Sequence, residues 1–453
     1  MRRAAPWLLA LVCAVGWLLS ARPEWLPSRA LDLAPTPRER LVRSLRAAGL
    51  DTTPAILTWL AAGAQALAAP ETVALPLAER LYFDGAEARA YAYALTPARG
   101  RVLTLGLDAS GLAGGRALAE LYAVDRSRTA GLRLLEAQPR GADSLRYYVD
   151  APGDTLVLRI EVTPLASGSV AVRLGTQPQL PVFPVGGGAS ERDVGSVWGD
   201  PRDGGRRRHE GIDVFAARGT PLLAAADATV TRVRDGGLGG KQVWLRTRDG
   251  LRLYYAHLDE QLATAGTRVG AGDTVGTVGN TGNARTTPPH LHFGVYAGGG
   301  AVDPFPFVRT ARRAPPLREP LAAGALPRMR TRRRVRSVAA DGGGGARPGG
   351  IRLSAKQLTY PRRQRGATTE VTLPGGERHW LRTRDLEALD RPLDTRSVRR
   401  ETALLVRADA RGREVAVAAP PRASTLRVVA RDAELGDFAL DEGGAAGWLR
   451  ESR

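Results

Sequence analysis

Alternating apolar and polar residues mark the region between residues 70 and 178. Apolar side chains occupy every even position from Leu156 to Val162 and again from Val170 to Leu174. This period of two is typical of strands with one buried face. A turn at Pro152-Gly153-Asp154 precedes the first run. The pattern predicts a small β-sandwich over residues 70–178.

Residues 31–69 carry a different, helical pattern. Leu41 and Leu45 are four positions apart, on one face of a helix. Thr53-Pro54 then gives a capping residue followed by proline at the first helical position. We expect a helical segment here.

From residue 190 to 308 the chain is glycine-rich, and helical periodicity is nearly absent. Pro184–Gly188 is a linker before this region, and Arg248-Asp249-Gly250 within it is a hairpin turn. These features predict an antiparallel β domain.

The C-terminal region contains two units that share a pattern. Glu370–Leu381 and Phe438–Leu449 each place a strand, a glycine-containing turn and a strand with tryptophan in the same order. The pattern resembles the end of bacterial SH3-like barrels, which implies such modules at 315–390 and 395–453. Two unrelated small β domains are the alternative. The fold class we expect is mainly β and multidomain.

Residues 1–30 suggest export. Arg2 and Arg3 precede a nearly unbroken apolar run from Ala4 to Leu19, which is short for a membrane span and suits a signal peptide. An uncleaved anchor in the inner membrane is the alternative. Either reading predicts a periplasmic or cell-envelope location.

The net charge of +19 changes this picture little. All but two of the 65 basic residues are arginine, beside 53 glycines and 31 prolines, which indicates a compositional bias. The charge also suits an acidic surface such as the cell wall. No motif of interleaved aromatic and basic residues supports a nucleic-acid partner.

Four of the five histidines lie between residues 209 and 292. They occur in His209-Glu210-Gly211-Ile212-Asp213, in Tyr255-Ala256-His257-Leu258 and in His290-Leu291-His292-Phe293. Residues two apart in a strand face the same side, so these segments can direct four imidazoles and the Asp213 carboxylate into one groove. Imidazole and carboxylate ligands suit zinc, and three such ligands are typical of a catalytic site.

Other interpretations of the cluster are four buried histidines without metal and a closed structural zinc site. The helical His-Glu-x-x-His motif is absent. Tyr255 shares strand parity with His257 and is a candidate for the substrate groove, with packing as the alternative.

Several segments together resemble the lysostaphin-type, LytM-like zinc endopeptidases. They occur in that family's order over about 120 residues: Gly195–Arg202, His209–Asp213, Gly219–Pro221, Tyr255–Leu258, Val278–Gly282, His290–Phe293 and Val302–Pro304. The resemblance implies that His209, Asp213 and His292 bind zinc, and that His257 and His290 are catalytic without binding it. Gly294, where many relatives carry an acidic residue, and the bulky segment 284–289 depart from the pattern.

The family implies a peptidase domain at 190–308 that hydrolyses peptide cross-links of peptidoglycan. The β-sandwich at 70–178 similarly resembles bacterial pre-peptidase domains, though loosely. Degenerate members lose one or more of the five site residues, and none is lost here. A non-catalytic regulator that binds peptidoglycan or activates another hydrolase is the alternative function.

Overall fold

The computed structural model describes residues 35–453 except 86, 125–130, 138–143, 151–152, 154, 318–320, 322–327, 339–347, 399–402, 409–413, 419–423, 433, 442–444 and 452–453. The expected signal or anchor, residues 1–30, lies outside the described residues. Among the helices of the described part, none has the length and apolar character to span a bilayer. The protein is mainly β, as the sequence predicts.

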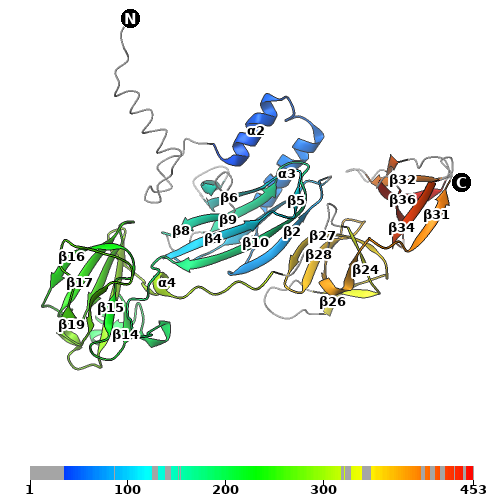
Figure 1. Ribbon diagram of the computed structural model, residues 1–453. Coiled ribbons are helices and arrows are strands. Elements are labelled where there is room, and N and C mark those ends of the chain that lie inside the picture. Colours follow the sequence, from blue (N-terminus) through cyan, green and yellow to red (C-terminus); the bar gives the residue numbers. More distant parts are fainter. Residues whose placement is uncertain are drawn as a thin grey trace, which may run out of the picture.

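Two helices lie against one face of the N-terminal sandwich (Figure 1). They are α2 (Pro37–Ala47) and α3 (Pro54–Ala68). Thr36 and Glu39 form a reciprocal capping box at the start of α2. Helix α3 buries Ile56 and Trp59, and the Trp59 indole donates to the Val162 carbonyl at 2.8 Å. This bond fixes α3 on the sandwich.

The sandwich has two antiparallel layers with one core between them. One layer has the order β1 (Glu71–Thr72), β3 (Ala90–Leu95), β9 (Leu156–Val162), β6 (Ala117–Val124), β7 (Leu132–Ala137), with only β1 parallel to its neighbour. The other has β2 (Leu77–Phe83), β10 (Ser167–Pro178), β4 (Arg101–Asp108), β8 (Ser144–Tyr148), with β5 (Leu112–Ala113) on β10. Side chains from both layers, including Leu81, Leu103 and Leu158, are fully buried in the core.

The histidine-bearing region forms a separate domain at one end of the sandwich (Figure 1). Its main sheet has the order β11 (Val194–Ser196), β14 (Ile212–Phe215), β22 (His290–Ala297), β18 (Arg252–Ala256), β17 (Gln242–Thr247), β16 (Ala228–Arg234), β20 (Arg268–Val269), with β23 (Gly300–Val302) on β22. A smaller sheet, β15 (Pro221–Leu223), β21 (Thr274–Val278), β19 (Leu258–Gln261), shares one hydrophobic core with it. The hairpin β12 (Pro201–Arg202) and β13 (Arg207–Arg208) precedes β14.

A short helix, α4 (Phe305–Val308), joins this domain to the sandwich. A Cβ on Gly100 would lie 2.3 Å from the Phe307 ring, so the ring rests directly on the sandwich backbone. Arg101 donates to the Pro306 carbonyl at 3.1 Å and to the Arg309 carbonyl at 2.5 Å. The domain is therefore attached at a defined place.

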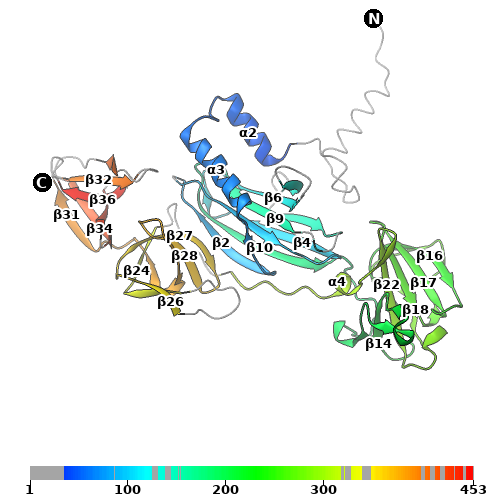
Figure 2. The same ribbon diagram turned by 180° about the vertical axis from the view of Figure 1, so that it is seen from behind.

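Two β modules follow at the other end of the sandwich (Figures 1 and 2). The first contains β24 (Met329–Thr331), β25 (Val335–Val338), β26 (Pro348–Leu353), β27 (Leu358–Arg365), β28 (Thr368–Thr372), β29 (Arg378–Arg382) and β30 (Leu386–Ala388). The second has the order β31 (Asp394–Val398), β34 (Ser424–Asp432), β35 (Gly436–Leu440), β36 (Ala446–Glu451), β32 (Ala403–Ala408), β33 (Glu414–Ala418). Their SH3-like character stays a prediction.

The first module is joined to the sandwich by strand pairing. Strand β27 pairs antiparallel with β2, with Glu79 opposite Arg365, so one sheet runs through both units. Figure 2 shows β2 and β27 side by side from behind. The chain thus leaves this shared sheet after β10, forms the histidine-bearing domain, and returns to the same sheet at β24–β27.

A cluster of carboxylates and guanidinium groups, the junction cluster, covers this pairing. It consists of Glu71, Glu79, Arg363, Arg365 and Glu370. Glu79 is completely buried and accepts from Arg365 Nη2 at 2.8 Å and from the Tyr93 hydroxyl. Glu71 pairs with Arg363 and, at 3.1 Å, with Arg365. The buried charges at the junction therefore have partners of opposite sign.

Candidate metal centre

Two paired strands carry two of the expected ligands. In the β14–β22 pair, Asp213 lies directly opposite His292. The residues on either side of them, such as Ile212 and Phe293, are completely buried in the core. The alternation of each strand therefore places Asp213 and His292 together on the other face of the sheet.

His209 reaches the same place from the segment just before β14. A Cβ on Gly211 would lie 2.5 Å from the His292 ring and 2.7 Å from the Phe293 carbonyl oxygen. Only glycine lets the chain pass this close to β22. This glycine is why the His209-x-x-x-Asp213 spacing brings both side chains to one point.

The three ligand atoms form an equilateral triangle. His209 Nε2, Asp213 Oδ1 and His292 Nδ1 are each 3.0 Å from the other two. A tetrahedral zinc ion with bonds of about 2.0 Å requires ligand atoms about 3.3 Å apart. The spacing fits such an ion.

The hydrogen-bond chemistry of the triangle also favours a cation. His209 Nδ1 lies 2.9 Å from the Val197 carbonyl, which only accepts, so Nδ1 carries the proton and Nε2 of the neutral ring presents a lone pair. The Asp213 carboxylate is an acceptor as well. Acceptors converging on one point repel one another unless a positive ion lies between them.

A second layer of polar groups holds Asp213. Arg202 Nη2 donates to Asp213 Oδ2 at 2.5 Å and to Ser196 Oγ at 2.8 Å, and Ser196 Oγ donates to Asp200 Oδ2 at 2.8 Å. Burial would raise the pKa of Asp213, but the adjacent imidazoles of His209 and His292 outweigh it and hold that pKa far below its usual range. Asp213 is therefore ionised and fixed in orientation, as second-layer bonds do for metal ligands.

His257 and His290 lie beside the triangle. Their ring centroids are 5.1 Å apart, and that of His257 is 5.9 Å from that of His292. His257 Nδ1 donates to the Thr281 carbonyl at 2.9 Å, and His290 Nδ1 to the Pro288 carbonyl at 2.9 Å. Each neutral ring therefore keeps an unprotonated Nε2. Burial, followed by the charges of His292 and His290, lowers the pKa of His257 to about 4.

The position of Tyr255 corrects the expectation that it lines the groove. Tyr255 is completely buried, and its hydroxyl donates to the Leu223 carbonyl and accepts from the Ala225 amide, each at 3.0 Å. The parity argument breaks because β18 ends at Ala256 and His257 has a φ of +66°. That left-handed residue turns the His257 side chain off the face that its parity predicts.

Sequence reasoning missed Arg202 and Tyr254. Arg202 lies within the matched Gly195–Arg202 segment, but nothing local indicates that it contacts Asp213. Tyr254 lies with its ring centroid 5.7 Å from that of His292. Its position follows once Tyr255 is assigned to the core, because strand neighbours face opposite sides.

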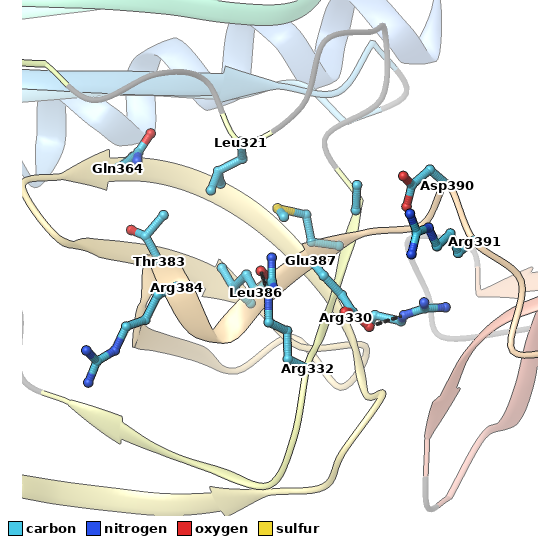
Figure 3. A pocket seen from close by; sticks show the side chains of 12 residues that line it. Leu321, Arg330, Arg332, Gln364, Thr383, Arg384, Leu386, Glu387, Asp390 and Arg391 are labelled. Carbon is cyan, nitrogen blue, oxygen red and sulfur yellow. Dashed lines mark hydrogen bonds and ion pairs between the residues drawn. The ribbon is translucent and has the colours of Figure 1, made fainter.

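The cavity in Figure 3 is a separate feature on the first C-terminal module. It has a volume of about 790 Å³, and Leu321 and Leu386 lie in its wall beside several arginines. One of its two carboxylates, Glu387, is neutralised by Arg330 at 2.7 Å and by Lys356 at 2.6 Å. It contains no histidine and does not take part in the metal centre.

Comparison with known proteins agrees with this geometry. Residues 207–304 match the model of Peptidase family M23. The chain therefore contains a domain of this family. The M23 domain thus confirms the lysostaphin-type resemblance, and zinc is the metal of this family, which the triangle fits.

Three similar proteins illustrate the match. The L-Ala–D-Glu endopeptidase of Bacillus subtilis is 35% identical over 130 residues, covering 26% of this chain and 40% of its own. The peptidoglycan DD-endopeptidase ShyC of Vibrio cholerae is 39% identical over 93 residues, covering 20% and 21%. The lysostaphin catalytic domain of Staphylococcus simulans is 33% identical, with 25% of this chain and 90% of that chain covered and a TM-score of 0.23. This chain spans less than half the length of the two curated relatives.

Proposed function

We propose that this protein is a zinc-dependent endopeptidase that hydrolyses peptide cross-links of bacterial peptidoglycan. The observation that carries the proposal is the triangle of His209, Asp213 and His292, with two further histidines beside it that keep Nε2 unprotonated. The relatives named as peptidoglycan endopeptidases support the substrate class.

His209, Asp213 and His292 are the residues that would hold zinc. When bound, zinc supplies a Lewis acid that polarises a carbonyl group and lowers the pKa of water. Arg202 keeps the Asp213 carboxylate in place through Oδ2, which leaves Oδ1 directed at the triangle.

The proton transfers fall to His257 and His290. The unprotonated Nε2 of one of these rings accepts a proton from the attacking water as a general base. Once protonated, an imidazole donates from the same atom to the developing oxyanion or to the leaving amine. Either ring fits either role, because the Nδ1 atoms of both donate to backbone carbonyls.

We also propose that the protein is exported to the cell envelope, on the basis of Arg2, Arg3 and the apolar run that follows. Fractionation of cells that express the full chain, with and without residues 1–30, tests this. Retention of both forms in the cytoplasm would contradict it.

The central experiment incubates the zinc-loaded full chain with purified sacculi and identifies released fragments by mass spectrometry. We expect soluble cross-link fragments with an amine and a carboxyl group freed at one bond. His209→Ala is the matched control and should bind no zinc and release nothing. A zinc-loaded wild-type protein that releases no fragment would favour the regulator, and a zinc-replete His209→Ala protein would contradict the ligand assignment.

A further inference from the structure

Three aromatic side chains lie together on the metal-bearing face of the main sheet. They are Trp244 on β17, Tyr254 on β18 and Tyr296 on β22, and we call them the aromatic shelf. Trp244 and Tyr254 stack with ring centroids 4.3 Å apart, and Tyr296 lies 5.2 Å from Trp244. The edge contact of Tyr254 with His292 makes the shelf continuous with the metal centre.

The shelf does not serve the core. Val243, Leu245, Leu253 and Val295, which alternate with the shelf residues, are completely buried on the opposite face. Each shelf residue keeps part of its surface exposed. The stacked rings therefore form a partly exposed apolar surface beside the metal ligands.

Glycine keeps this surface uninterrupted. Gly294 lies directly opposite Tyr254, and a Cβ there would lie 3.3 Å from the Tyr296 ring and 3.4 Å from Tyr254 Cβ. A larger side chain would extend between the rings. Glycine at this position thus leaves room for the shelf.

Two arginines border the shelf on the same face. Arg246 and Arg252 are exposed and directly opposite each other, and neither has an acidic partner among the described residues. Like charges in this position destabilise a sheet. Arg252 also lies over the Tyr296 ring at 5.5 Å. The pair provides unmatched positive charge at the end of the aromatic surface.

We propose that the aromatic shelf is a sugar-binding subsite, which holds a pyranose ring of the glycan strand while the attached peptide reaches the metal centre. This inference rests on the proposed function. Peptidoglycan stem peptides consist of small and charged residues, so the flat apolar faces of the polymer belong to its sugars. Aromatic faces pack against such C–H surfaces. Arg246 and Arg252 then meet the carboxylates that the same polymer carries.

The dimensions agree with an adjacent subsite. Ala256 lies opposite His292, and Tyr254 is two residues along the same strand. Residues two apart are separated by about 6.5–7 Å. The shelf therefore begins about 7 Å from the triangle at Tyr254 and, at Tyr296, four residues along β22 from His292, reaches about 13 Å from it, which leaves room for stem peptide between the sugar and the metal centre.

The test compares two soluble substrates with the same cross-linked peptides, one that carries disaccharides and one from which an amidase has removed them. For Trp244→Ala we expect the preference for the sugar-bearing substrate, as a ratio of kcat/KM values, to fall about tenfold, mainly through KM. Trp244→Phe, which keeps a ring, should restore most of it. Tyr148→Ala, at a half-exposed tyrosine on the sandwich, is the matched control and should behave as wild type.

Direct binding separates this inference from the proposed function. Peptide-free glycan oligomers are titrated calorimetrically into the zinc-loaded full chain and into Trp244→Ala with equal zinc content and melting temperature. Weaker binding by the variant supports the shelf, even if wild type hydrolyses neither substrate. Equal binding, no binding to wild type, or an equal loss on both substrates would overturn it; the last would assign the shelf to the peptide or to folding.

Discussion

Two buried clusters of charged and polar groups in this protein differ in their balance. At the junction cluster, each carboxylate has an arginine, and completely buried Glu79 is bonded on both oxygens. At the metal centre, three hydrogen-bond acceptor atoms lie 3.0 Å from one another, and they have too few hydrogen-bond donors to satisfy all three. A balanced cluster holds two parts of a fold together, whereas an unbalanced one needs a cation from outside.

The largest expected effect is on catalysis without a change in metal. His257→Ala removes a proton-transfer group that does not belong to the triangle, so kcat should fall by about 10²- to 10⁴-fold while zinc content stays near one per chain. Activity on sacculi and metal analysis of the same sample measure both. Loss of zinc from this variant would contradict the assignment of His257 as a catalytic histidine that does not bind the metal.

The junction cluster should respond in stability. Glu79→Ala leaves the buried Arg365 guanidinium and the Tyr93 hydroxyl without their acceptor, which should cost about 3–5 kcal/mol in the free energy of unfolding. Urea denaturation measures it. Arg46→Ala, which removes an exposed guanidinium paired with Asp51, should cost less than about 1 kcal/mol. Similar losses for both would show that burial does not set the effect.

A smaller effect is expected at the second layer of the metal centre. Arg202→Ala frees the Asp213 carboxylate to rotate, which should weaken zinc binding about 10- to 100-fold. Competition with a chelator of known affinity measures this. Arg207→Ala, at an exposed arginine of the same hairpin paired with Asp203, is the control, and equal weakening there would argue against a specific positioning role for Arg202.

The smallest effect concerns pH. Burial would raise the pKa of Glu71, but Arg363 and Arg365 outweigh it and lower that pKa below 4.5. A depressed carboxyl pKa gives stability that is present above the unfolded-state value and is lost as the pH falls through the folded-state value. The free energy of unfolding should therefore fall less between pH 7 and about pH 4 in Glu71→Gln than in wild type. An equal fall in both proteins would contradict this.

The sequence predicted what local periodicity and spacing encode. Alternation placed His290 and His292 on one face of a strand, and the core side chains Leu291 and Phe293 on the other. It failed at His257, where one left-handed residue ends the alternation and turns the His257 side chain away from the core face on which Tyr255 lies. A single backbone angle of this kind leaves no mark in a hydrophobic pattern.

Contacts between distant segments were not predictable. Glu79 and Arg365 are 286 residues apart, and each by itself is an ordinary charged residue of a strand. The division into sandwich, M23 domain and C-terminal modules likewise gave no sign that β2 and β27 pair. Strand edges find their partners through the whole fold, and the single sequence carries no signal for that choice.

The pairing of β2 with β27 makes the M23 domain an insertion, because the chain enters it from and returns to the same sheet. A protease cut in the connection at 311–317 would break the covalent path yet leave both fragments bound through the shared sheet. Removing everything after α4, by contrast, would expose the edge of β2 and leave the buried Glu79 carboxylate without the Arg365 guanidinium. The M23 domain is thus replaceable as a unit, whereas the sandwich and the first C-terminal module are not separable.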